Sequence, residues 1–295
     1  MMKHERTPGN FLFDTINILI LTALCITTIF PFLNIITMAF SPGTISFTKL
    51  HIFPTEWTME NINKILTNEY IASGFISTIT RTVVGTALGL IMTIFAAYPL
   101  SKKTLPNRSF WTSFIVITMF VSGGMIPNYL LVNSLGIMNT VWALVLPGVI
   151  NTFNMIIARN FFMMLPPELE EAAKIDGANE MLILFLIIIP ISMPIIATLF
   201  LWIAVGHWNA WFDSMIYTRD ARKLVLQVVM RRIVLEGTQQ MLDLNPSVND
   251  PNQTITNPET IKAATILVTT LPIIVLYPFL QKYFVKGVMV GSLKG

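Results

Sequence analysis

The sequence predicts an all-α protein that lies in a membrane and crosses it about six times. Hydrophobic residues make up 54% of the 295-residue chain, charged residues make up only 12%, and the mean hydropathy is +0.66. A soluble domain carries about 25% charged residues, so the charges in this chain are too few to cover a globule of its size. The apolar residues gather in long runs that lack the alternation of β-barrel strands.

Each apolar run is long enough to cross a membrane as a helix, because about 30 Å of hydrocarbon takes roughly 20 helical residues. Backbone polar groups in lipid must be paired within their own segment, which favours helices for isolated runs. The predicted spans are residues 15–40, 74–100, 110–131, 141–157, 181–205 and 263–283. Residues 1–295 are thus predicted to form one transmembrane domain.

The positions of lysine and arginine predict that both termini face the cytoplasm. The cytoplasmic pieces then carry Lys3, Arg6, Lys102, Lys103, Arg108, Arg159, Lys174, Lys282, Lys286 and Lys294. The predicted long outer loops are residues 41–73, with a short helix after Thr58, and residues 206–262. The first outer loop holds Lys49 and Lys64, and the short second one, between the third and fourth spans, holds no lysine or arginine. The third outer loop, residues 206–262, holds Arg219, Arg222, Lys223, Arg231 and Arg232. Long loops obey the rule less strictly, so the short loops decide. The net charge of +3 then reflects orientation and does not indicate a nucleic-acid partner.

Two features of the second predicted span favour specific contacts. Arg81 lies near its outer end, and we expect its side chain to extend to the interface; lining a cavity is the alternative. Gly85 and Gly89 form a close-packing pattern, and together with Ala96 and Ala97 they are expected to face a second helix bundle.

Most chemistry that would give the chain an energy source of its own is missing from the sequence. It contains no Gly-rich phosphate-binding loop ending in Lys-Ser/Thr, no His-Glu-x-x-His zinc helix and no Gly-x-Ser-x-Gly elbow. The three histidines, His4, His51 and His207, are far apart, so no metal site is expected. The spans lack the paired carboxylates of proton-coupled carriers. The sequence therefore predicts that this chain is not an enzyme and that another subunit supplies energy.

The most informative segment is the predicted cytoplasmic loop 158–180, where PPELEEAAKIDGANE begins at Pro166. Pro167 and the acidic residues after it favour the first turn of a helix. Glu170 and Lys174 are spaced to pair along the helix, and Gly177 would end it in a left-handed conformation. The residues alone fit two interpretations equally well. The loop is either a short capped helix with a function or a solvated connector.

The spacing in this loop resembles the EAA motif of ABC importer permeases. The matching positions are Glu171, Ala172, Ala173, Asp176, Gly177 and, thirteen residues after the glycine, Pro190. Ile189 stands where the family often has leucine. Further segments, which begin at Asn133, Arg159, Gly206 and Lys282, resemble the carbohydrate-uptake (MalG-like) branch and most resemble polysaccharide or oligosaccharide permeases of the LplC/YtcP type.

The resemblance implies a MetI-like permease fold in a bacterial cell membrane. It also implies a second homologous permease, a pair of cytoplasmic ABC ATPases that bind ATP and Mg, an extracytoplasmic solute-binding protein and a sugar substrate. No cofactor is implied in this chain. The EAA loop would act as a coupling helix that docks on the ATPase.

Sugars bind through aromatic faces together with amide and carboxylate groups. Candidates for the substrate pathway are Trp208, Asn209, Trp211 and Asp213, with Asn128 and Asn154 as weaker ones. An aromatic belt at the membrane interface is the alternative for the tryptophans. Other functions stay open: a permease for a non-sugar solute, a channel, an ion-coupled carrier, or a membrane-embedded enzyme.

Overall fold

The computed structural model describes residues 8–43, 53–54, 56–236 and 257–292. Every secondary-structure element among these residues is a helix, as predicted. The chain divides into two compact units, one made of Met1–Asn68 with Arg232–Leu271 and the other of Glu69–Arg231 with Pro272–Gly295. Parts of both predicted outer loops and the basic residues Lys3, Arg6 and Lys294 lie outside the described residues.

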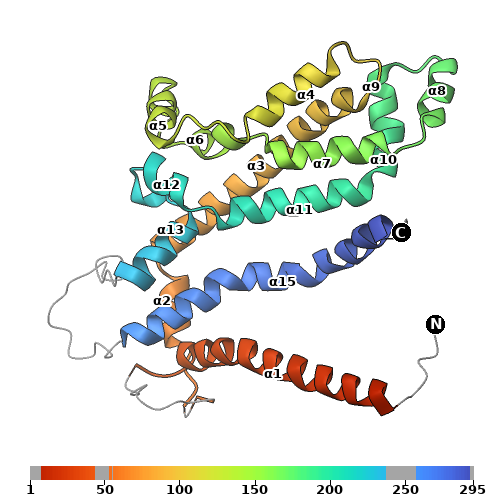
Figure 1. The fold of residues 1–295 in the computed structure, drawn as a ribbon. Helices are drawn as coiled ribbons and strands as arrows, with labels where there is room; N and C mark the ends of the chain where they lie inside the picture. The colour runs from red at the N-terminus through yellow and green to blue at the C-terminus, as the bar shows by residue number, and fades with distance from the viewer. Residues whose placement is uncertain (1–7, 44–52, 55, 237–256, 293–295) are drawn as a thin grey trace. The chain divides into compact units, whose positions relative to one another are not determined.

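The helices of the second unit begin with α3 and end in the C-terminal part of α15 (Figure 1). They are α3 (Glu69–Ser101), α4 (Arg108–Ile117), α5 (Met125–Ser134), α6 (Val141–Val145), η1 (Leu146–Gly148), α7 (Thr152–Met163), α8 (Glu168–Ile175), α9 (Glu180–Ile183), η2 (Leu184–Ile188), α10 (Ile189–Ile191), α11 (Met193–Asn209), α12 (Phe212–Tyr217), η3 (Ala221–Lys223) and α13 (Leu226–Arg231). The first unit holds α1 (Pro8–Ala39), α2 (Glu60–Leu66), η4 (Arg232–Glu236) and the start of α15 (Pro258–Ser292).

Helix α3 is the centre of the second unit and packs mainly against α11 and α7 (Figure 1). Its buried positions repeat at helical spacing and include several small residues, which let neighbouring helices approach closely. Gly85 lies against His207 of α11, and a β-carbon at Gly89 would lie 3.1 Å from the carbonyl oxygen of Val149. The expectation that these glycines face another helix bundle is therefore wrong, because the fold uses them internally.

The fifth predicted span, residues 181–205, is bent rather than straight. The segments Glu180–Ile191 and Met193–Asn209 meet at 84°. Pro190 explains part of this geometry: it has no N–H to donate, and its ring crowds the carbonyl four residues earlier, so the preceding turn widens into the π-helix η2. The fourth predicted span is also bent, by 53°, between Val141–Gly148 and Thr152–Met163.

The third predicted span, residues 110–131, is interrupted. Helix α4 ends at Ile117 and α5 begins at Met125. Between them lies Gly123-Gly124, and Gly124 has a φ of +85°, a conformation that a right-handed helix excludes. The apolar run is continuous in composition, but it is divided by residues 118–124, and the conformation of Gly124 excludes a helix there.

In the first unit, the amide of Asn61 fastens three helix ends together. Its Nδ2 donates to the carbonyls of Ala39 (3.2 Å) and Ser41 (2.8 Å) at the end of α1, and its Oδ1 accepts from Thr260 of α15 (3.4 Å). Asn61 lies on α2, which confirms the short helix predicted after Thr58. A buried amide with these partners satisfies carbonyls that the end of α1 would otherwise leave free.

Three of the described helices, in α1, α3 and α15, are long and apolar enough to cross a membrane, and up to five spans result if each bent pair counts as one. Large apolar side chains on α1 face outward; Phe11, for example, is 75% exposed. Such a continuous apolar surface fits lipid and not water. The total of six spans and the position of both termini stay predictions.

Candidate functional site

Helix α8 is built as the loop sequence predicts. It runs from Glu168 to Ile175, with acidic residues in its first turn and Lys174 in its last. Gly177 has a φ of +83°, which confirms the left-handed cap. The N–H of Ala178 donates to the carbonyl of Ala173 (2.9 Å) and that of Gly177 to Lys174 (3.0 Å). This pair of bonds is a Schellman cap, which stops the helix and redirects the chain into α9.

Contacts at the end of α3 hold α8 in place. Glu170 forms an ion pair with Lys102, which also lies 4.0 Å above the ring of Tyr98. The Tyr98 hydroxyl donates to Glu180 (3.1 Å), and Glu180 in turn pairs with Lys174 (2.7 Å). Hydrogen bonding to Glu180 raises the pKa of Lys174 above its usual value. The predicted pair of Glu170 with Lys174 is therefore wrong, because each has a partner on a different element.

The EAA residues divide between two faces of α8. Ala173 is buried and belongs to the hydrophobic core that α3, α7 and α9 share. Glu171, Ala172 and Asp176 are exposed. The helix is thus fixed to the bundle by one face, and the other presents a carboxylate beside a small side chain. Ala173 therefore packs inward, and Glu171 and Ala172 are the neighbouring motif residues on the exposed face.

A second polar site lies on α3, where Arg81 is only 3% exposed. Its guanidinium pairs with both carboxylate oxygens of Asp213, one of them at 2.9 Å. It also donates to the carbonyls of Ala210 (3.2 Å) and Leu144 (3.3 Å). The expectation that Arg81 extends to the interface is wrong, because both terminal nitrogens of its guanidinium find these acceptors inside the bundle. One side chain thereby joins α3, α6 and the turn that follows α11.

The candidates for the substrate pathway do not form one cluster. Asp213 is occupied by Arg81, and the ring of Trp211 lies 4.2 Å from the guanidinium carbon of Arg231. Trp208 is buried, and its indole N–H has no partner among the described residues. The remaining candidates are three asparagines with different settings. Asn209 donates to Val205, Asn154 is buried in the first turn of α7, and Asn128 is exposed on α5.

Comparison with known proteins gives the family. No family model matches the chain. It is 42% identical over 293 residues to Protein LplC of Bacillus subtilis, covering 99% of this chain and 98% of that protein. It is 38% identical over 290 residues to the polygalacturonan/rhamnogalacturonan transport system permease protein YtcP of the same organism, covering 97% and 99%. The chain belongs to the carbohydrate-uptake family of ABC importer permeases. It is thus an integral membrane protein that works within an ABC transporter.

The fold agrees with this family. The crystal structure of a bacterial ABC transporter that imports the acidic polysaccharide alginate contains a chain with a TM-score of 0.86 and 28% identity, covering 96% of this permease and all of that chain. The relatives are transport permeases, so the permease transports its substrate and does not itself transform it.

Sequence reasoning missed the partnership of Arg81 with Asp213, although a signal was present. Both charges lie near the ends of predicted spans that should be on the same side of the membrane. An unpaired charge at that depth is costly, so each charge should have prompted a search for the other. In this permease Asp213 therefore has a structural partner, which weakens its case as a direct sugar ligand.

Proposed function

We propose that the permease forms half of the membrane pathway of an importer for an oligosaccharide or a polysaccharide-derived sugar. The observation that carries this proposal is its end-to-end similarity to YtcP, whose name gives polygalacturonan and rhamnogalacturonan as its cargo. This similarity extends over 97% of the chain, so it includes both the loop 158–180 and the outer ends of the helices.

The proposed assembly has the composition that the family resemblance implies. A second homologous permease completes the pathway, two cytoplasmic ATPases bind ATP and Mg, and a solute-binding protein delivers the sugar from outside. This chain itself holds no cofactor. In the bacterial cell membrane it crosses the bilayer six times in a MetI-like arrangement, with both termini in the cytoplasm. The exposed apolar surface of α1 supports contact with lipid.

The step proposed for α8 is the transfer of ATPase movement to the membrane helices. Glu171 and Ala172 on its exposed face dock in the ATPase, with the carboxylate making a charge-assisted hydrogen bond. The Lys102–Glu170 ion pair and the buried Ala173 couple the helix to α3, and the glycine cap couples it to α9. A helix held at both ends moves as a lever, whereas a solvated connector would absorb the movement.

The sugar pathway is proposed to pass the outer end of α11. Asn209 offers an exposed amide there, and Trp211 offers a half-buried aromatic ring. Trp208 and Asn154, both buried, would shape the wall behind them.

Reconstitution of the complete transporter in proteoliposomes tests the proposal. Oligogalacturonides supplied with the solute-binding protein should accumulate inside vesicles only when the ATPases have ATP. A matched preparation without the solute-binding protein should show basal ATP hydrolysis and no uptake. Uptake by this chain alone, without any ATPase, would contradict the proposal and favour a channel or an ion-coupled carrier.

A further inference from the structure

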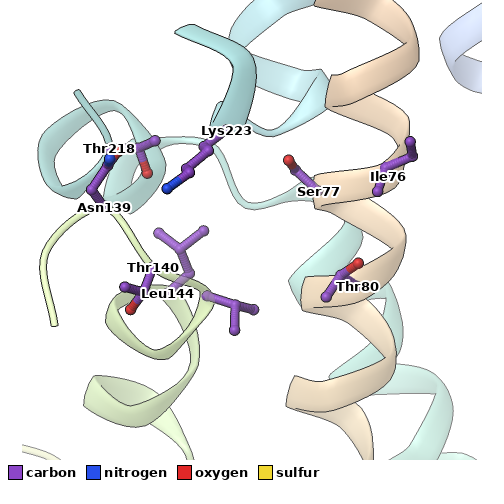
Figure 2. Close-up of a pocket in the computed structure, with 9 residues that line it drawn as sticks. Ile76, Ser77, Thr80, Asn139, Thr140, Leu144, Thr218 and Lys223 are labelled. Atoms are coloured by element: carbon purple, nitrogen blue, oxygen red, sulfur yellow. The ribbon is translucent and has the colours of Figure 1, made fainter. Parts of the chain in front are cut away.

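A cavity of about 300 Å³ lies beside α3, near the end of that helix predicted to face outside (Figure 2). Its polar lining consists of Ser77, Thr80, Asn139, Thr140, Thr218 and Lys223, and its apolar lining of Ile76, Val141 and Leu144. Figure 2 shows the nitrogen of Lys223 directed toward the side of Asn139 and Thr218, with Ser77 and Thr80 on α3 on the opposite side. Hydroxyls, an amide and one cation around an apolar patch are the groups that hold a charged sugar ring.

Lys223 differs from the other basic residues of its segment. Arg219 donates to the hydroxyl of Tyr129 (3.1 Å), Arg222 pairs with Glu69 (3.1 Å), and Arg231 covers the ring of Trp211. The side-chain ammonium of Lys223 is exposed and has no hydrogen bond or ion pair within the part of the chain that the structure describes, whereas its backbone N–H donates to the carbonyl of Asp220 (3.0 Å). An unpaired ammonium in a pocket of neutral groups favours an anionic ligand.

The walls of the pocket are held in position before any ligand arrives. Asn139 accepts hydrogen bonds from the backbone N–H groups of Arg219 (3.2 Å) and Asp220 (3.1 Å) through its Oδ1. These bonds orient the amide and leave its Nδ2 hydrogens as donors for a ligand. The carbonyl of Leu144 accepts from buried Arg81, which fixes the apolar wall. Such preorganisation reduces the entropy lost on binding.

We propose that this pocket binds one acidic sugar unit of the transported saccharide, with the carboxylate on Lys223 and the ring hydroxyls on Ser77, Thr80 and Asn139. The inference rests on the proposed function and adds to it the place on this chain where an acidic unit is held. A volume of about 300 Å³ is at the lower end for ligand pockets and suits one ring rather than a chain. Leu144 and Val141 offer an apolar surface for the C–H face of that ring.

Binding to the purified, complete transporter in detergent tests the assignment. The probes are trigalacturonate and its methyl ester, in which a methyl group neutralises each carboxylate. We expect trigalacturonate to bind more tightly than the ester. Lys223→Gln should weaken trigalacturonate binding about tenfold, as expected when one partner of a charge-assisted hydrogen bond is removed at a partly exposed site, and should leave ester binding unchanged.

Two further variants test whether the effect comes from the charge at this pocket or from a change in charge anywhere on this segment. Lys223→Arg keeps the charge and should retain most of the preference for the acid. Arg222→Gln removes the same charge from the neighbouring residue, which does not line the pocket, and should have little effect. Equal affinity for acid and ester, unchanged binding in Lys223→Gln, or an equal loss in Arg222→Gln would overturn the assignment. None of these results bears on ATP-dependent uptake, so failure of the pocket is distinguishable from failure of the proposed function.

Discussion

At the scale of single residues, the pairing of Arg81 with Asp213 holds a buried guanidinium against a carboxylate from a distant part of the chain. Arg81 is 3% exposed, whereas the side chain of Asp213 is 30% exposed, so water reaches only one partner. A guanidinium fits a carboxylate in a two-pronged geometry, and the two terminal nitrogens of Arg81 also donate to two carbonyls, while its Nε has no partner among the described residues. A buried Arg81 needs a carboxylate partner because its guanidinium stays protonated and cannot become neutral.

Removing the carboxylate should therefore be more harmful than removing both charges. Asp213→Ala leaves a buried cation unpaired and should destabilise the permease by roughly 2–4 kcal/mol, somewhat below a fully buried case because Asp213 is partly exposed. The double variant Arg81→Met with Asp213→Ala should recover much of this loss. Thermal unfolding of the assembled transporter measures both. Asp14→Ala, at an exposed carboxylate, serves as a control, and a double variant less stable than the single one would refute the idea.

At the scale of helices, the contact of α3 with α11 depends on a missing side chain. A β-carbon at Gly85 would overlap the imidazole ring of His207, whereas one at Gly206 on α11 would meet nothing within 4 Å. The two glycines therefore have different roles: the first makes room for a neighbouring helix, and the second lies in open space.

Gly85→Leu and Gly206→Leu form a matched pair that tests this difference. Overpacking at Gly85 should cost roughly 1–3 kcal/mol, because His207 and α11 must move away. The same substitution at Gly206 should leave stability within about 0.5 kcal/mol, as is usual for sites without special contacts. Thermal unfolding in detergent gives both values. Similar losses in the two variants would mean that the close approach at Gly85 is unimportant.

The end of α8 depends on backbone conformation rather than on space. Gly177 adopts a left-handed φ, yet a β-carbon there would meet nothing within 4 Å. Gly177→Asn should therefore retain coupling, because asparagine tolerates this conformation, whereas Gly177→Val adds roughly 1–2 kcal/mol of strain. The readout is ATP hydrolysis stimulated by the loaded solute-binding protein. Equal stimulation in both variants would show that the cap does not transmit movement.

The attachment of α8 to α3 offers a second test of coupling. Lys102→Met removes the ion pair with Glu170 and the contact above Tyr98. We expect the variant to retain basal ATP hydrolysis and to lose at least half of its sugar-stimulated component, because α8 is held less firmly. Lys103→Met is the matched control, since Lys103 is the exposed neighbour. Identical behaviour of the two variants would place the ion pair outside the coupling route.

At the scale of the whole molecule, the sidedness of the loops is the prediction that most needs a direct test. Cys25 is the only cysteine of the chain, so Cys25→Ser gives a background without thiols. A cysteine replacing Lys103, which is exposed and has no proposed docking role, should react with a membrane-impermeant maleimide only from the cytoplasmic side. One replacing Lys223 should react only from outside. Reaction of both from one side of intact cells or inverted vesicles would contradict the predicted orientation.

The sequence by itself determined the class of the protein and its family. The shortage of charge forced an apolar environment, and 20-residue apolar runs in lipid leave helices as the only economical structure. The boundaries of α8 also followed from local rules, since a proline, a first turn of acids and a glycine cap act within a few residues. Properties that depend on near neighbours in the chain were therefore predictable.

Only the tertiary structure decided the partners of charged and small residues. Glu170 pairs with Lys102 instead of Lys174, Arg81 meets Asp213 after 132 residues of chain, and Gly85 accommodates His207. The break near Gly124 and the bend near Pro190 likewise divided runs whose composition was continuous. Such contacts depend on how distant helices pack, and composition and periodicity carry no information about which side chains meet across that distance.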